Sequence, residues 1–156
     1  MRLSELQEGL LLWGLPSLQG IAVVKEKARA DQGVYVLVPE MRPYLLGLTI
    51  ANRLQEEGIK NVYATDNMLG ILFYKRKIKE VIFFYKELTD HHAVGICGSL
   101  YVCLLARVHN VPIKPLQGEK KIRSALAASL LDEYTRFHYN DMLKAADEAV
   151  PEAIVQ

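Results

Sequence analysis

Residues 34–70 constrain the fold of this chain more than any other part of the sequence. They begin with VYVLV at 34–38, an unbroken apolar run that is typical of a strand buried on both faces of a parallel sheet. A helix should follow, because Pro43 suits the first helical position and Gly58 suits the residue just past a helix end. A second apolar segment then leads to Asp66, a residue type that commonly caps helices. The stretch therefore predicts a strand, a helix, a strand and the start of a further helix.

The rest of the chain continues this alternation of apolar strands and amphipathic helices. Further strands are expected at residues 81–85 and 111–116, and further helices at residues 4–13, 17–30, 67–74, 99–109, 119–137 and 140–149. Strands that alternate with helices of about 10–15 residues indicate an open parallel sheet with helices on both faces, a three-layer α/β fold. We expect this domain to span residues 1–118, with residues 119–156 forming a helical C-terminal tail packed on it.

Composition and charge exclude several classes of protein. The formal net charge of +1 gives no bulk electrostatic case for binding nucleic acid or an anionic membrane. No apolar run approaches the roughly 18 residues of a membrane span, and the apolar N-terminal residues 10–13 lack the basic start of a signal peptide. Cys97 and Cys103 are placed on different helix faces, which favours free thiols in a reducing compartment. We therefore expect a cytoplasmic protein.

The carboxyl ends of the predicted strands are where a ligand should bind, since open parallel sheets bind ligands in the crevice beyond those ends. Arg42 stands directly before Pro43, so its guanidinium should lie near a helix N-terminus, a combination that favours an anion such as a phosphate. The alternative is an ion pair of Arg42 with Glu40 or Asp66 that locks the loops. Asp66 and Asn67 fit a plain capping role, which we favour over contact with a ligand.

Other motifs with chemical meaning are weak or missing. His91 and His92 are neighbours, and neighbouring side chains of an extended segment point opposite ways, so they do not predict a metal site. The chain contains no GxGxxG, GxxxxGK[ST] or GxSxG pattern, so no common motif supports a nucleotide-binding loop or a hydrolase nucleophile. We expect neither a metal nor a cofactor.

Four collinear blocks resemble a known family. They are PEMRPYLLG (family ETRPxLQG), ATDNMLG (family TDNMAG), KEVIFF (family DxVIxGAD) and VGICGSLYVCLLARVHNVPIKP (family KIGTYxLALLAKxHxIPFYV). The chain thus resembles the superfamily of 5-methylthioribose-1-phosphate isomerase, ribose-1,5-bisphosphate isomerase and the alpha, beta and delta subunits of translation initiation factor 2B. The resemblance covers roughly residues 34–116. It implies a Rossmann-like C-terminal domain whose crevice, in the isomerases, holds a phosphorylated ribose, and which often pairs with a second copy.

The departures from the family bear on chemistry. The isomerases that the chain resembles use a cysteine and an aspartate to move a proton between sugar carbons. The aspartate of GAD falls on Lys86, and the cysteine of a THCN segment would fall near residues 6–8, which contain no cysteine. Proton transfer needs a group that takes and gives a proton near neutral pH, so we expect the parent isomerisation to be lost. The candidate ligand-binding residues are Glu40, Arg42, Asp66, Asn67, Lys86 and Gly95.

Three functions remain open at this point. The first is a non-catalytic binding or regulatory domain, a pseudoenzyme that takes a phosphorylated sugar or a nucleotide. The second is an aldose–ketose isomerase of phosphorylated ribose with altered chemistry, for which Lys86, Glu87, His91 or His92 would supply acid and base. The third is an assembly module that forms a homodimer, the commonest way to cover apolar surface that a small domain leaves exposed.

Overall fold

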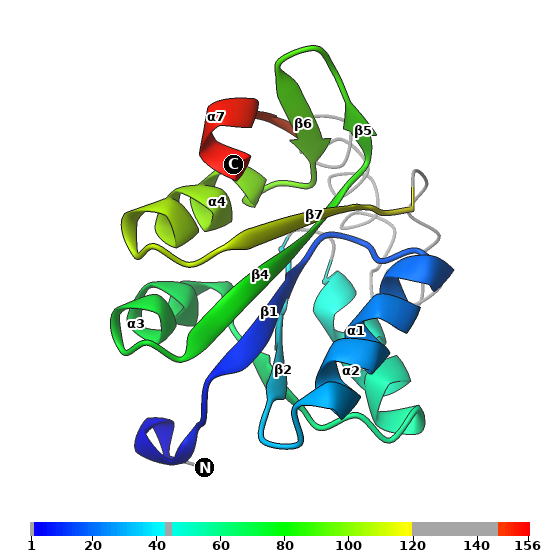
Figure 1. Ribbon diagram of the computed structural model, residues 1–156, viewed down its shortest axis with the longest axis vertical. Coiled ribbons are helices and arrows are strands. Elements are labelled where there is room, and N and C mark those ends of the chain that lie inside the picture. Colours follow the sequence, from blue (N-terminus) through cyan, green and yellow to red (C-terminus); the bar gives the residue numbers. More distant parts are fainter. Residues whose placement is uncertain (1, 43–44, 120–146) are drawn as a thin grey trace, which may run out of the picture.

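The computed structural model describes residues 2–42, 45–119 and 147–156. Its main feature is a five-stranded sheet of order β3-β2-β1-β4-β7, in which every neighbouring pair is parallel. Its strands are β1 (Gly9–Trp13), β2 (Tyr35–Pro39), β3 (Asn61–Ala64), β4 (Ile78–Tyr85) and β7 (Ile113–Gln117). Helices α1 (Leu18–Ala30) and α2 (Leu46–Glu56) cover one face, and α3 (Leu69–Tyr74) and α4 (Ser99–Val108) cover the other (Figure 1). The predicted open parallel α/β fold with helices on both faces is confirmed.

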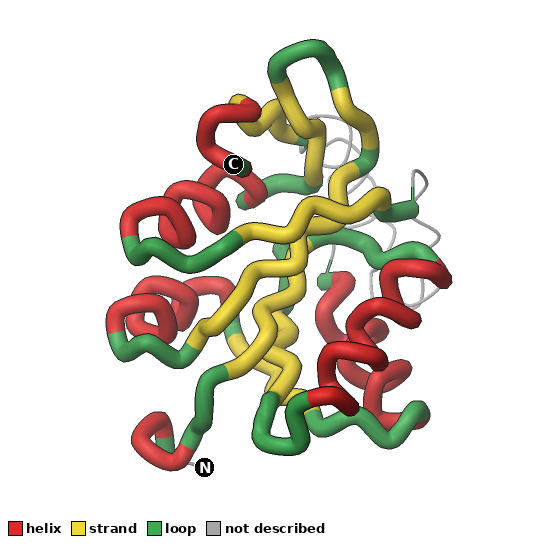
Figure 2. The backbone as a smooth tube through the Cα atoms, viewed as in Figure 1, coloured by secondary structure: helices red, strands yellow, loops and turns green. Residues whose placement is uncertain are grey.

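Smaller elements complete the fold. A second, antiparallel sheet has the order β5-β6-β8. Its strands are β5 (Glu87–Leu88), β6 (His92–Gly95) and β8 (Glu148–Pro151), and the short helical elements are η1 (Leu3–Glu5), η2 (Asp66–Met68) and α7 (Glu152–Val155). Figure 2 shows the strands of the large sheet between two groups of helices, with the small sheet beyond one end. No helix in the described ranges is both long and apolar enough to cross a bilayer.

The N-terminal segment corrects our prediction of a helix over residues 4–13. Only Leu3–Glu5 forms a helical turn, and Gly9–Trp13 is β1, the central strand of the sheet. All five residues of β1 are buried, because β2 and β4 flank the strand and helices cover both faces. A Cβ at Gly9 would lie 2.6 Å from the carbonyl oxygen of Tyr35, so β1 and β2 pack too closely there for a side chain. A short apolar run has no periodicity that separates a buried strand from a buried helix.

The predicted strand–helix–strand unit of residues 34–70 has its helix end where we expected it, but the helix begins later than predicted. Gly58 has φ +72°, and the N–H of Ile59 donates to the carbonyl of Leu54 at 2.9 Å, as expected for a glycine that ends a helix. At the start, α2 begins at Leu46 rather than at Pro43, which lies outside the described residues. A Cβ at Gly47 would lie 1.8 Å from the carbonyl oxygen of Pro39, so this first turn packs directly on the end of β2.

The C-terminal residues differ from the predicted helical tail where the structure describes them. Glu148 and Ala149, expected in a helix, belong to strand β8, which pairs with β6. Val150 is buried and faces the core, so the segment gains more from strand pairing than from a solvent-exposed helix. Of the helix expected over residues 119–137, Glu119 is described and is not helical, and residues 120–137 lie outside the described residues. The proposed division at residue 118 stays a prediction.

The central position of β1 predicts a large cost for truncating it. Leu11 has no exposed surface, so Leu11→Ala should lower the free energy of unfolding by about 2–5 kcal/mol through lost burial and a cavity. Leu18→Ala is the matched control, because Leu18 is 72% exposed at the start of α1 and should change stability by less than about 0.5 kcal/mol. Urea denaturation of both variants measures the difference, and equal small losses would contradict a buried central strand.

Candidate functional site

The candidate site lies at the carboxyl edge of the large sheet. From β1 the chain steps outward to β2 and β3, then crosses to the other side of β1 to form β4 and β7. This reversal beside β1 is the switch point at which open α/β sheets form a ligand crevice. We call the carboxyl edge at this switch point the crevice; Gly14 follows β1 there, Glu40 follows β2, Thr65 follows β3 and Lys86 follows β4.

A polar cluster ties the loop after β2 to the loop after β3. The carboxylate of Asp66 accepts hydrogen bonds from the backbone N–H groups of Met41 at 2.9 Å and Arg42 at 2.8 Å. The predicted capping role of Asp66 is wrong, because Thr65 is the N-cap of η2 and the Asp66 carboxylate binds the backbone of a loop 24 residues earlier. Met41 adopts φ 56°, an uncommon conformation for a non-glycine residue that these bonds help to hold.

Arg42 forms the ion pair that we weighed as the alternative to anion binding. Its Nε lies 3.2 Å from Oε2 of Glu40, and its side chain is 67% exposed. A pair this exposed contributes little to stability and leaves the other guanidinium nitrogens accessible to solvent. Glu40, Arg42 and Asp66 are thus brought together as predicted, whereas Asn67 is exposed in η2.

The environment of Asp66 raises the pKa of its carboxyl group. Burial is the largest cause, the N–H groups of Arg42 and Met41 oppose it, and the nearby Glu40 carboxylate adds to it. Burial also raises the pKa of Tyr63, with Glu40 and Asp66 contributing. The cluster therefore has an excess of negative charge, despite Arg42.

Lys86 lies at the same edge but is engaged by the C-terminal segment. Its Nζ is 2.7 Å from Oδ2 and 2.8 Å from Oδ1 of Asp147, and its side chain is 20% exposed. The residue on which the family aspartate falls is therefore a cation that is already paired with a carboxylate.

The turn between β6 and α4 brings in residues that the sequence did not single out. Oε2 of Glu148 accepts a hydrogen bond from the backbone N–H of Leu100 at 3.0 Å, in the first turn of α4. Burial, followed by the Glu148 carboxylate, raises the pKa of the Cys97 thiol. Beneath this turn, a Cβ at Gly98 would lie 2.5 Å from Cζ2 of Trp13. The indole Nε1 of Trp13 is buried and has no hydrogen-bond partner among the described residues.

Four residues of the site were not singled out from the sequence: Trp13, Cys97, Asp147 and Glu148. Different signals would have been needed to find them. Trp13 is the last residue of β1 and follows once that strand is recognised. Cys97 stands in the turn before α4. Asp147 and Glu148 reach the crevice only through the pairing of β8 with β6, which no local pattern announces.

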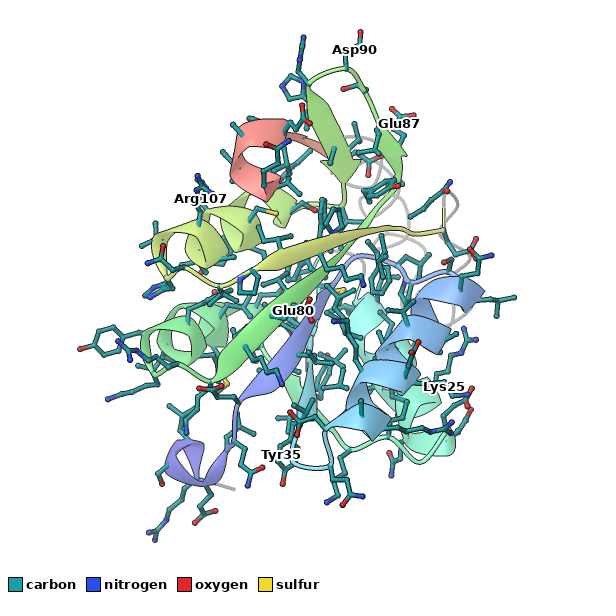
Figure 3. All side chains as sticks on the ribbon, viewed as in Figure 1. Lys25, Tyr35, Glu80, Glu87, Asp90 and Arg107 are labelled. Atoms are coloured by element: carbon teal, nitrogen blue, oxygen red, sulfur yellow. The ribbon has the colours of Figure 1, made fainter. Side chains whose placement is uncertain are left out.

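The remaining predicted residues are not part of the crevice cluster. Glu87 on β5 and His92 on β6 are exposed in the small sheet, and Figure 3 shows Glu87 there, away from the helices of the large sheet. Gly95 is buried, and a Cβ there would lie 2.4 Å from Oγ of Ser99, so this glycine serves close packing. Residues 6–8, where the family cysteine was expected, precede β1 at the opposite edge of the sheet. No group of three or more metal-ligating side chains occurs within the described ranges.

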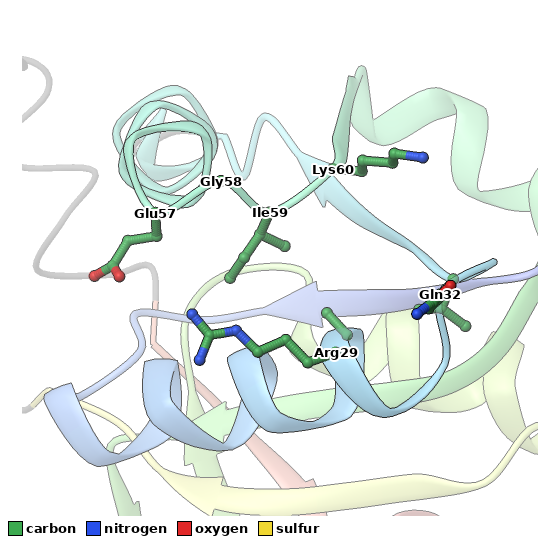
Figure 4. Close-up of a pocket in the computed structure, with 8 residues that line it drawn as sticks. Arg29, Gln32, Glu57, Gly58, Ile59 and Lys60 are labelled. Carbon is green, nitrogen blue, oxygen red and sulfur yellow. The ribbon is translucent and has the colours of Figure 1, made fainter.

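A cavity of about 410 Å³ lies at that opposite edge, between the ends of α1 and α2 (Figure 4). Its lining includes Arg29, Gln32, Glu57 and Lys60, and Glu57 is ion-paired with Lys25. None of the predicted crevice residues lines it, so it is a separate feature of the fold.

The titration of Asp66 tests the cluster. Because the folded state holds this proton more tightly, the group favours folding at low pH, and the contribution is lost as pH rises through the raised pKa. Carboxyl ¹³C NMR should give Asp66 a midpoint above its ordinary 3.8. Asp31 is the control, since a hydrogen bond from Lys79 lowers the pKa of that carboxyl below 3.8. A midpoint of Asp66 at or below that of Asp31 would contradict the described environment.

Comparison with known proteins identifies the family of the chain. Residues 15–151 match the profile of the Initiation factor 2 subunit family, IF-2B. The chain belongs to this family. The methylthioribose-1-phosphate isomerase of Caldicellulosiruptor saccharolyticus is 33% identical over 94 residues, 59% of this chain and 28% of that protein. The corresponding enzyme of Leptospira interrogans is 32% identical over 94 residues, 59% of this chain and 26% of that protein.

Solved structures of this IF-2B family share the fold. 5-Methylthioribose 1-phosphate isomerase from Pyrococcus horikoshii OT3 superposes with a TM-score of 0.70 at 16% identity, covering 97% of this chain and 49% of that one. The delta subunit of translation initiation factor eIF-2B from A. fulgidus gives a TM-score of 0.65 at 19% identity, with 97% and 52% covered. This chain therefore spans about half the length of these structures, and its 94 matched residues cover about a quarter of each of the two isomerases.

Proposed function

We propose that this chain is a non-isomerising member of the IF-2B family whose crevice binds a phosphorylated sugar or nucleotide in a regulatory role. The ion pair between Lys86 and Asp147 carries the proposal. The resemblance puts the aspartate of the isomerases at this position, whereas an ammonium group has no free electron pair with which to accept a proton.

The other crevice groups are also poorly suited to proton transfer. The pKa of the Cys97 thiol is raised by burial, so it stays protonated at neutral pH, and only the thiolate is reactive. Both carboxylate oxygens of Asp66 already accept backbone hydrogen bonds. His92 is exposed on the small sheet. Among the described crevice residues, no side chain is placed as a general base near pH 7.

Support for binding comes from the exposed guanidinium of Arg42. Its planar nitrogens can form two parallel hydrogen bonds to a phosphate, which makes arginine a preferred phosphate ligand. An incoming phosphate would compete with Glu40 for a guanidinium that is mostly solvated already.

Activity and binding assays test this proposal together. Methylthioribose 1-phosphate, the substrate named for the isomerases, should give no product, and calorimetry should show binding that weakens about threefold or more in Arg42→Gln. Arg29→Gln is the control, because Arg29 lines the separate cavity at the opposite edge. Turnover that is lost in Lys86→Ala would support the altered-isomerase alternative, and an absence of heat would contradict the binding role.

A second candidate role is homodimer assembly through the outer faces of α3 and α4. These neighbouring helices expose apolar side chains along one side: Ile71, Tyr74, Tyr101, Leu104 and Val108. Tyr101, Leu104 and Val108 follow a spacing of three and four residues, so they form one stripe on α4. Contiguous exposed apolar surface of this kind commonly marks a protein interface, and a symmetric dimer is its commonest use.

Sedimentation velocity tests the assembly role. The wild-type chain should sediment as a dimer, and Leu104→Asp should shift it to monomer by placing a charge within the apolar stripe. Leu18→Asp is the matched control, because Leu18 is exposed on α1 across the sheet. A wild-type chain that stays monomeric at all concentrations would remove this role.

A further inference from the structure

The described C-terminal segment, residues 147–156, lies against the crevice edge. Strand β8 pairs with β6, and the N–H of Glu152 donates to the carbonyl of His91 at 2.8 Å. Val150 and Val155, which belong to the segment, are buried. In Figure 1 this segment, which ends in the red helix α7, packs beside α4 and β6. Its position is therefore set by strand pairing and apolar burial.

Two consecutive carboxylates of this segment bind two groups that attract anions: the Lys86 ammonium and the N-terminus of α4. Asp147 accepts two hydrogen bonds from the Lys86 ammonium. Glu148 accepts from the N–H of Leu100 in the first turn of α4, a helix whose N-cap residue, Gly98, has no side chain to do so. Helix N-termini attract anions through free N–H groups and the helix dipole. The chain thus supplies its own anions where a ligand would bring a phosphate.

Trp13 provides an independent observation, a buried hydrogen-bond donor close to the start of α4. Its side chain is 2% exposed, and Nε1 has no acceptor within the described part of the chain. The six-membered ring of Trp13 packs against the start of α4, since Cζ2 would lie 2.5 Å and Cε2, the atom bonded to Nε1, 3.5 Å from a Cβ at Gly98. A buried N–H without an acceptor is costly and calls for an explanation such as a bound water or ligand.

We propose that Asp147 and Glu148 act as an internal ligand of the crevice, which a phosphate-bearing molecule must displace in order to bind Lys86 and the start of α4. This inference rests on the proposed binding role and adds its regulation. A phosphate carries the negative charge and the acceptor oxygens that the two carboxylates now supply to the Lys86 ammonium and the Leu100 N–H. The apparent affinity for phosphate should then equal the intrinsic affinity multiplied by the fraction of molecules in which the segment is undocked.

The competing explanation is that both carboxylates serve only the packing of the tail. Removing their charge would then weaken the fold and create no binding. The two explanations differ in sign for phosphate affinity, so a binding measurement separates them.

The test uses the full chain and inorganic phosphate as the probe. The near-isosteric double variant Asp147→Asn with Glu148→Gln should bind phosphate about tenfold or more tightly than wild type by calorimetry. Adding Lys86→Gln to the double variant should abolish the gain, since Lys86 is the cation that is released. Glu152→Gln is the matched control on the same segment, because that carboxylate accepts from Gln156 and not from the crevice.

A folded double variant that binds phosphate no more tightly than wild type would overturn the inference, with thermal unfolding used to establish that it is folded. Should the double variant fail to fold, phosphate titration of the wild type by ¹⁵N NMR decides the matter. The Leu100 amide should shift, and no shift at saturating phosphate would also overturn the inference. Isomerase turnover would contradict the proposed function alone, so the two failures are distinguishable.

Discussion

The burial of β1 between β2 and β4 is the constraint on which the rest of the structure depends. Its side chains contribute to the core on both faces of the sheet, and its backbone pairs on both sides. The reversal of strand order beside β1 also opens the crevice. The same strand ends in Trp13, which packs against Gly98 and whose indole N–H has no partner among the described residues.

The proposed loss of isomerisation agrees with how the charged groups of the crevice are paired. Arg42 is paired with Glu40, Lys86 with Asp147, and Asp66 with the backbone of the loop after β2. Each of these contacts holds a loop or the C-terminal segment in place. A site arranged in this way is suited to binding that exchanges one anion for another, and poorly suited to moving protons, which needs a group poised between two protonation states.

Sequence alone predicted the fold class and much of the local structure, because those depend on short-range pattern. The run at 34–38 reads as a buried strand without ambiguity, and Gly58 ends its helix through a conformation that glycine favours. The strand β1 was missed because four apolar residues in a row fit a buried helix equally well. Asp66 was assigned a local cap although its partners lie 24 and 25 residues away. Asp147 and Glu148 depend on a strand pairing with residues more than 50 positions earlier, a separation at which no sequence periodicity acts.

The central claim is that the crevice has lost the ability to move a proton on a sugar phosphate. Incubation with methylthioribose 1-phosphate in D₂O, followed by mass spectrometry, tests this most directly, because abstraction of a carbon-bound proton leaves deuterium in the sugar even when no net product forms. The account predicts no incorporation above the buffer control. Deuterium incorporated at a sugar carbon by the wild-type chain would contradict it.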